Sequence, residues 1–153
     1  MPILIRGKTI CDVCSRTIGE GEDVLGVPPL ISNSLDPLFK YNDRVFHVGC
    51  MEGTPDFQKL VSLITLWEDR SRDKVSFLSG KVITSPDDFF ILPYLGEAAR
   101  LARFSFRVCS KYDLSKWDGL PALIEGLDDL QSSGAWGGDA LVKLTAELKA
   151  IIA

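Results

Sequence analysis

Apolar residues recur at helical spacing in three stretches of the chain. The clearest follows Thr54, which is a predicted N-cap, and Pro55, which suits the first helical position. The apolar positions of this stretch would lie on one buried face of a helix. They are Phe57, Leu60, Val61, Ile64 and Trp67. The same spacing predicts two further helices over residues 121–131 and 139–152.

Short apolar or alternating runs between these helices predict strands. They cover residues 3–5, 23–27, 40–46, 75–78, 81–84, 89–92 and 104–109. The runs at 75–78 and 81–84 flank Ser79-Gly80, so we expect them to form a hairpin. The stretch between 26 and 40 contains Pro28-Pro29 and is expected to be a surface loop. Residues 132–138 are rich in glycine and serine and are expected to be a flexible link.

These elements predict an α+β protein of two parts that share an interface. Residues 1–73 would form one part, and residues 74–153 a small mixed α/β module. No stretch rich in proline, glycine or serine separates the halves, so a single composite domain is the alternative. We see no internal repeat and no low-complexity tract in the sequence.

Two pairs of metal-binding residue types stand near the start of the chain. Cys11-Asp12-Val13-Cys14 is matched by His47-Val48-Gly49-Cys50, and these hold the only histidine and three of the four cysteines. Ligands three positions apart can face one ion from a tight turn or from the first turn of a helix. Cysteine and histidine at this spacing predict a four-coordinate structural zinc site, with Cys11, Cys14, His47 and Cys50 as its ligands.

Two other readings of these residues remain open. The cysteines could be buried free thiols beside a core histidine, because free cysteine often packs as a small hydrophobic residue. A disulfide would leave His47 unexplained and needs an oxidising compartment.

A metal bound by the four residues would close the 32 residues from Ser15 to Phe46 into a loop, which would remove much of the entropy of the unfolded chain.

The residues around these pairs resemble a known kind of zinc finger. The sequence Ile10-Cys11-Asp12-Val13-Cys14, a turn at residues 19–21, and Val45-Phe46-His47-Val48-Gly49-Cys50 are similar to the first zinc-binding half of a LIM domain. More broadly, they resemble a treble-clef finger. The resemblance covers the first third of the chain and implies a knuckle, a β-hairpin and a helix held together by one zinc ion, in a scaffold that usually binds proteins and sometimes nucleic acid. The gap between the pairs is longer than in LIM fingers, and no second ligand set follows Cys50.

Charge and hydropathy narrow the function classes. The net charge is −4 and the pI is near 5.0, which disfavours binding to a phosphate backbone or to an anionic membrane surface. No apolar run approaches the roughly 20 residues that a membrane span needs. The first residues lack the apolar core of a signal peptide, so we expect a cytoplasmic protein with reduced thiols.

Other reactive residues form no recognisable catalytic set. Asp87-Asp88 is expected to lie in a turn, and Asp128-Asp129 on a solvated helix face. Neither pair is an acid–base site by itself, because adjacent side chains point in different directions. Cys109 has no histidine partner, since His47 is assigned to the metal, and is expected to be a small packed residue.

The sequence therefore predicts a non-catalytic, protein-binding module with one structural zinc ion. The alternatives are a small acidic inhibitor of the bacterial immunity or antitoxin kind, and an enzyme whose site is assembled from dispersed polar residues. No catalytic residues are assigned, the partner is expected to be another protein, and neither nucleic acid nor membrane is expected to be one.

Overall fold

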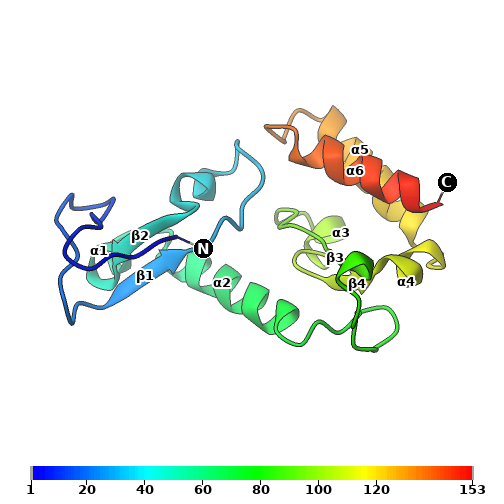
Figure 1. The fold of residues 1–153 in the computed structure, drawn as a ribbon. Coiled ribbons are helices and arrows are strands. Elements are labelled where there is room, and N and C mark those ends of the chain that lie inside the picture. Colours follow the sequence, from blue (N-terminus) through cyan, green and yellow to red (C-terminus); the bar gives the residue numbers. More distant parts are fainter. Residues whose placement is uncertain (1, 153) are drawn as a thin grey trace. The chain divides into compact units, whose positions relative to one another are not determined.

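The computed structural model describes residues 2–152 and divides into two compact units (Figure 1). The first unit comprises the chain up to Leu30 together with Pro37–Thr65, and the second comprises Ile31–Asp36 and the chain from Leu66. Within residues 2–152, six α-helices and two separate two-stranded antiparallel sheets are present, which confirms the expected mixture of helix and strand. The predicted domain boundary between residues 73 and 74 stays a prediction.

The first unit is built around one antiparallel strand pair. Strand β1 (Val24–Val27) pairs with β2 (Arg44–His47), with Val24 opposite His47 and Val27 opposite Arg44. Between them lies a 3-10 helix, η1 (Pro37–Tyr41), and helix α1 (Val48–Glu52) follows β2 directly. Helix α2 (Phe57–Ser71) begins in this unit. The strand expected over 40–46 is therefore shorter than predicted.

Two local features explain the difference between the expected and observed elements here. Asp43 has a φ of 54°, a left-handed conformation that interrupts an extended strand, so β2 starts only at Arg44. Thr54 does not cap α2, because its hydroxyl donates to the carbonyl of Met51 at 2.8 Å and the helix begins at Phe57. The prediction of a cap at Thr54 is thus wrong, although the predicted helix is present.

Several residues between β1 and β2 have buried side chains. Leu30 and Leu38 are 6% and 1% exposed, and Tyr41 packs edge-on against Phe46 with ring centroids 5.8 Å apart. The Tyr41 hydroxyl also donates to Asp56 at 2.8 Å. The expectation of a plain surface loop is wrong for Leu30 and Leu38, because their apolar side chains are buried.

The second unit combines a short strand pair with a helical layer. Strand β3 (Phe89–Ile91) follows a 3-10 turn, η2 (Pro86–Asp88), and pairs with β4 (Val108–Ser110). Helix α3 (Ala99–Ala102) lies between them, and α4 (Lys111–Ser115) follows β4. Helices α5 (Leu120–Ser132) and α6 (Ala140–Ile152) confirm the two predicted carboxy-terminal helices and pack against each other.

The strands of the second unit are shorter than the apolar pattern predicts. The hairpin expected over 75–84 is reduced to a single bridge between Val75 and Val82. The strand expected over 104–109 starts only at Val108, because Phe106 has a φ of 58° and turns the chain. Some side chains of both stretches are nevertheless buried, namely Ser76 and Ile83 in the first and Phe104 and Phe106 in the second.

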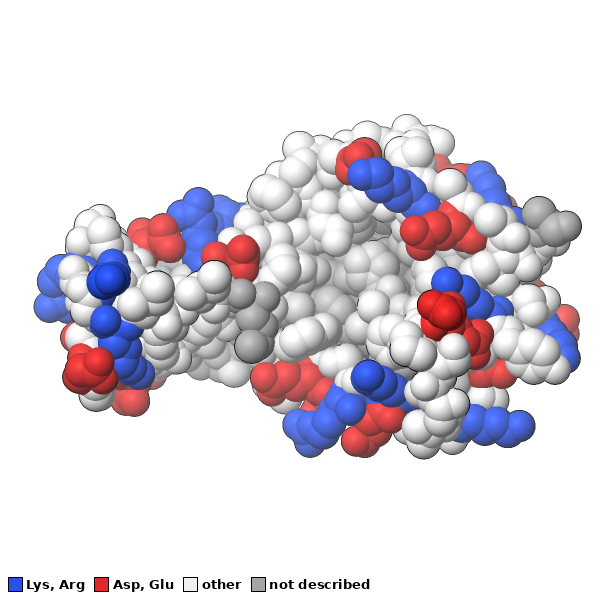
Figure 2. Space-filling model, in the orientation of Figure 1, with Lys and Arg blue, Asp and Glu red and all other residues white. Residues whose placement is uncertain are grey.

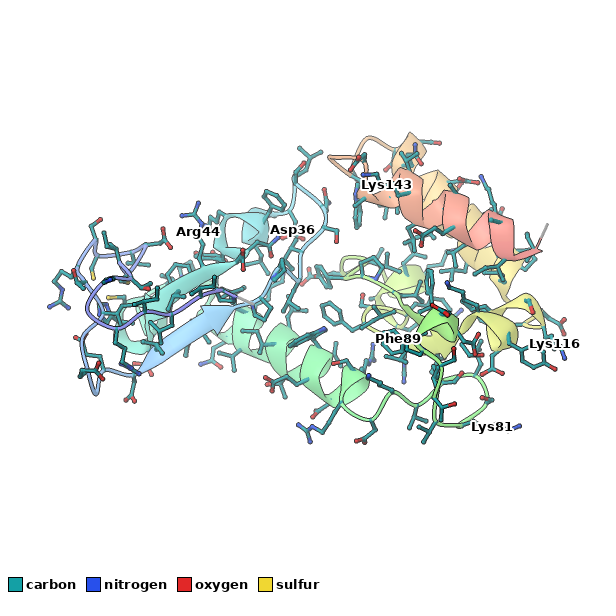
Figure 3. The ribbon with its side chains drawn as sticks, viewed as in Figure 1. Asp36, Arg44, Lys81, Phe89, Lys116 and Lys143 are labelled. Atoms are coloured by element: carbon teal, nitrogen blue, oxygen red, sulfur yellow. The ribbon has the colours of Figure 1, made fainter. Side chains whose placement is uncertain are left out.

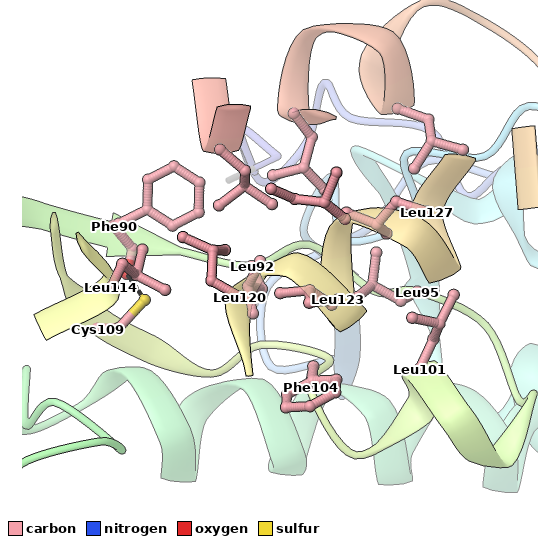
Figure 4. Close-up of a cluster of buried hydrophobic side chains, with 14 residues drawn as sticks. Phe90, Leu92, Leu95, Leu101, Phe104, Cys109, Leu114, Leu120, Leu123 and Leu127 are labelled. Atoms are coloured by element: carbon pink, nitrogen blue, oxygen red, sulfur yellow. Dashed lines mark hydrogen bonds between the residues drawn. The ribbon is translucent and has the colours of Figure 1, made fainter. Parts of the chain in front are cut away.

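A single apolar cluster holds the second unit together (Figure 4). It combines residues of β3, β4 and α3 to α6, and includes Leu92, Leu114, Leu120, Leu127 and Leu141, each at most 1% exposed. Cys109 is fully buried within it, which confirms its expected role as a small packed residue.

The expected flexible link at 132–138 is held by a segment distant in sequence. The Asn33 side chain donates to the carbonyl of Ala135 at 3.0 Å and accepts from the amide of Gly137 at 2.8 Å. A Cβ atom at Gly137 would collide with Ser34 and Leu35, so the close approach requires glycine. The link is therefore an anchored turn. No helix among the described residues is long and apolar enough to cross a membrane.

The leucine core of the second unit leads to a stability prediction. Leu127→Ala should lower the free energy of unfolding by about 2–5 kcal/mol, because it removes a fully buried side chain and leaves a cavity. Val142→Ala, at a position 48% exposed on α6, is the matched control and should change it by less than about 0.5 kcal/mol. Chemical denaturation of both variants measures the difference, and equal effects would contradict the assigned core.

Candidate metal centre

The four predicted ligands meet at one point of the first unit. The Sγ atoms of Cys11, Cys14 and Cys50 and a ring nitrogen of His47 all lie within 4.8 Å of one another. The Cys14 Sγ atom lies 3.4 Å from His47 Nδ1, and the Cys50 Sγ atom lies 3.8 Å from the same nitrogen. Among the described residues, this is the one cluster of its kind. These four residues could hold a metal ion.

A tight turn presents the first two ligands. The Cys11 amide donates to the carbonyl of Arg16 at 2.9 Å, and the Ser15 amide donates to the carbonyl of Cys11 at 2.9 Å. Ser15 has a φ of 58°, which reverses the chain, and Ile10 and Thr17 form a bridge that closes the turn. The turn brings the side chains of Cys11 and Cys14 to the same side, as the spacing of the pair predicts.

The junction between β2 and α1 presents the other two ligands. His47 is the last residue of β2 and Cys50 lies in the first turn of α1, so a sharp change from strand to helix brings them together. The amide of His47 also donates to the Cys11 sulfur at 3.4 Å, which ties the junction to the turn. Figure 3 marks β2 by the side chain of Arg44, which pairs with Asp12 in the turn at 2.7 Å.

A carboxylate outside the ligand set orients the histidine ring. Glu22 Oε2 lies 3.2 Å from His47 Nε2 and accepts from the amide of Gly19 at 2.5 Å. With Nε2 donating its proton to the carboxylate, Nδ1 carries the lone pair that faces the sulfurs. Sequence reasoning treated residues 19–22 only as a turn and missed Glu22. A carboxylate at this spacing carries no signal until the strand register places it beside His47.

The sulfur atoms have unequal proton affinities. Hydrogen bonds from the backbone and side chain of Arg16 lower the pKa of Cys14 to about 6. Burial opposes ionisation of Cys11, but backbone hydrogen bonds lower its pKa below the ordinary value. Burial and the two neighbouring cysteines raise the pKa of Cys50 to about 11. The third thiolate is therefore unfavourable beside the others, and a bound cation would offset that repulsion.

The donor atoms and their surroundings fit a metal ion. Cys11 is fully buried and His47 is 7% exposed, so their polar atoms face one another and not water. Three sulfurs and one imidazole nitrogen complete a four-coordinate set. The fourth cysteine, Cys109, lies in the core of the second unit, where burial raises its pKa to about 12 and makes it an unreactive thiol.

The paired aspartates lie where the sequence placed them. Asp87 and Asp88 belong to the 3-10 turn η2, and Asp88 accepts from the amide of Tyr112 at 3.0 Å. Asp128 pairs with Lys149 at 3.0 Å, and Asp129 pairs with an arginine on another helix at 3.1 Å. Asp88, Asp128 and Asp129 thus each have a structural partner.

Two cysteine variants separate the ligands from the core thiol. Cys14→Ser should lose the bound metal and destabilise the first unit, because the energy of metal binding acts as folding energy. Cys109→Ser should keep the metal and cost about 1 kcal/mol, as expected for a small change in a core. Elemental analysis and thermal unfolding measure both effects. Equal metal loss in the two variants would show that Cys109 is a ligand.

Searches of protein-family models, of curated proteins and of solved structures found no match to this chain.

Proposed function

We propose that the four residues form a structural zinc site in a treble-clef-like finger similar to the first half of a LIM domain. The support is the donor set together with the order of elements: a knuckle turn, the β1–β2 pair, and a helix that carries the last ligand. Thiolate and imidazole donors suit zinc, whereas magnesium and calcium prefer oxygen. Reduced thiols at this site fit a cytoplasmic location, where such pairs commonly bind metal.

We further propose that the protein is a non-catalytic module that binds another protein. The observation that carries this proposal is the complete ligand set, because four protein donors leave no position for a substrate or a reactive water. Zinc in such a site would only cross-link the turn that carries Cys11 and Cys14 to helix α1. The function of the finger must then lie in the surface that the metal holds in place.

Exposed aliphatic side chains near the knuckle support a protein partner. Ile3, Ile5, Ile10 and Val13 are 80%, 51%, 55% and 46% exposed, and all belong to the segment that ends at Cys14. Exposed aliphatic side chains on one short stretch of the chain favour contact with an apolar surface of another protein.

The charge of the protein argues against a nucleic acid as the partner. The net charge is −4, and Lys and Arg lie interspersed with Asp and Glu on the face shown in Figure 2. A phosphate backbone is bound by a continuous basic surface, which this face does not offer.

The identity of the metal is the first test of this proposal. Protein purified under reducing conditions without added metal should contain about one zinc ion per chain, because one four-ligand set is complete. Elemental analysis by mass spectrometry measures the content. A content near zero in reduced, folded protein would refute the zinc site, and a content near two would show that further ligands exist.

The binding role is tested with surface variants that keep the metal. Ile10→Asp/Val13→Asp should abolish capture of a partner from a cell extract, because two charges would be buried in the apolar contact. The control is Val142→Asp on α6, an aliphatic residue of similar exposure, and it should capture the same partner as the wild type. Quantitative mass spectrometry compares the proteins captured by the wild type, the double variant and the control.

The result also separates the alternative functions. A captured basic toxin or nuclease would specify the acidic inhibitor. No partner sensitive to Ile10→Asp/Val13→Asp, or turnover of ester, peptide or nucleic-acid substrates that a chelator abolishes, would contradict the proposed binding role.

A further inference from the structure

The second unit contains a turn of the same kind as the metal-site turn. The Ser76 amide donates to the carbonyl of Lys81 at 2.9 Å, and the Gly80 amide donates to the carbonyl of Ser76 at 2.8 Å. Gly80 has a φ of 69°, and Val75 and Val82 form the bridge that closes the turn. Figure 3 marks this turn by the side chain of Lys81.

Each of these features has a counterpart 65 positions earlier. The Cys11 amide donates to Arg16, the Ser15 amide donates to Cys11, Ser15 has the positive φ, and Ile10 and Thr17 form the bridge. The next hydrogen bond also recurs, from residue 18 to residue 9 at 2.8 Å and from residue 83 to residue 74 at 2.9 Å. The two turns therefore share one backbone pattern.

The strand pairs that follow have the same register. Val24 lies opposite His47 in the first unit, and Phe89, again 65 positions later, lies opposite Ser110 in the second. In both units a helix begins at the residue after the second strand. Helix α1 begins at Val48, after β2, and α4 begins at Lys111, after β4. The strand and its helix thus meet in the same way twice.

The offset between corresponding residues is 65 positions up to Leu30 and Leu95, and 63 positions from Leu38 and Leu101 onward. Asp43, just before β2, has a φ of 54°. Its counterpart Phe106, two residues before β4, has a φ of 58°. Helices α2 and α5 begin at Phe57 and Leu120. The buried apolar positions also correspond. They pair Ile18 with Ile83, Val27 with Leu92, Leu30 with Leu95, Leu38 with Leu101, Tyr41 with Phe104, Val45 with Val108, Met51 with Leu114, and Leu60 with Leu123.

The four metal ligands have counterparts that cannot form a soft-metal site. The pairs are Cys11 and Ser76, Cys14 and Ser79, His47 and Ser110, and Cys50 and Asp113. Burial follows the same correspondence at the first position, where Cys11 is 0% and Ser76 is 1% exposed. Three hydroxyls and one carboxylate thus occupy the places of three thiols and one imidazole.

These four residues bind one another directly. The hydroxyls of Ser76 and Ser79 donate to the same Asp113 oxygen, Oδ2, at 2.5 Å and 2.6 Å. The amide of Asp113 donates to the hydroxyl of Ser110 at 2.9 Å. The turn is thereby joined to the strand–helix junction through one carboxylate and two hydroxyl protons. The protons offset the negative charge, which in the first unit would require a cation.

We infer that the chain contains two copies of one finger, and that the second copy is closed by the Ser76–Ser79–Ser110–Asp113 hydrogen-bond cluster in place of a metal. The sequence prediction of no internal repeat is therefore wrong. The repeat escapes inspection of the sequence because the four cysteine and histidine positions, which carry its signature, are the ones that differ. The comparison of the two sites rests on the proposed zinc site of the first copy, but the duplication of the fold does not.

The inference predicts that the second copy can be converted into a metal site. The full-length variant Ser76→Cys/Ser79→Cys/Ser110→His/Asp113→Cys should bind one more cobalt ion than the wild type, which is about two per chain against about one. Cobalt titration under reducing conditions, followed by thiolate-to-cobalt absorption, counts the ions. The same four changes in a Cys11→Ser/Cys14→Ser background should give about one. Failure of the first site therefore does not obscure the result for the second.

A shifted variant provides the matched control. It carries Ser76→Cys/Ser79→Cys/Asp113→Cys with Lys111→His in place of the change at Ser110, and so has the same ligands with the histidine one position along. It should bind the additional cobalt at least about tenfold more weakly, because the imidazole leaves the common point. A folded four-residue graft that binds no more cobalt than its parent, or no more tightly than the shifted control, would overturn the inference.

A measurement on the unmodified protein decides the matter if the graft does not fold. Removal of the metal with a chelator should increase amide hydrogen exchange in residues 9–18 and 44–52, and leave residues 74–83 and 108–115 protected as before. Equal loss of protection in both pairs of segments would show that the second turn also depends on a metal, and would overturn the inference.

The cluster also predicts a pH dependence specific to Asp113. Hydrogen bonds from Ser76, and then from Ser79 and Ser110, lower the pKa of this carboxyl below its ordinary value of 3.8, and Lys81 adds to the effect. Its stabilising contribution is therefore present above pH 3.8 and is lost as the pH falls through the folded-state value. The other charged group near the cluster is Asp88, which lines the same 210 Å³ hollow.

Asp113→Asn should lower the thermal midpoint at pH 7 while the metal content stays unchanged, and the gap between wild type and variant should narrow as the pH falls below about 4. Asp88→Asn is the control for a general loss of charge and should not reproduce that narrowing. A gap for Asp113→Asn that is independent of pH, or a loss of metal, would contradict the assigned role of the cluster.

Discussion

Three sulfur atoms and an imidazole nitrogen within 4.8 Å of one another are the constraint on which the first unit depends. Their arrangement draws a turn, a strand end and a helix start together, in a unit that also buries Ile18, Phe46 and Met51. The pKa of Cys14 is lowered to about 6 and that of Cys50 is raised to about 11, so three thiolates side by side are unfavourable. A bound cation would offset this repulsion, and its binding energy would then act as folding energy.

The second unit meets the same geometric demand with different chemistry. A turn must again be joined to a strand–helix junction, and one carboxylate that accepts two hydroxyl protons makes the connection. Hydrogen bonds of this kind contribute less than a metal site. The packing of α6 on α5 and the large leucine cluster also stabilise this unit.

The parts of the fold that the sequence predicts are those that rest on local spacing. The helix after Thr54 and the two carboxy-terminal helices follow from apolar periodicity, and the ligand cluster follows from the two pairs with a spacing of three. The strands expected over residues 40–46 and 104–109 both start later than predicted, because the backbone turns at Asp43 and Phe106 with a positive φ. A phenylalanine gives no signal of such a turn in the sequence. Glu22 becomes recognisable only when the pairing of β1 and β2 places it beside His47. The relation between the two units becomes recognisable through backbone hydrogen bonds and strand register, which then align their buried apolar positions.

The attachment of Asn33 to the turn at Ala135 and Gly137 has a topological consequence. The chain leaves the first unit after Leu30, contributes Ile31–Asp36 to the second, and returns at Pro37 before it finally departs near Thr65. The polypeptide therefore crosses between the units three times, and no single cleavage of the backbone can yield both as intact fragments. Limited proteolysis or a truncated expression clone would remove a segment from one unit or the other. The two units are thus covalently interlaced.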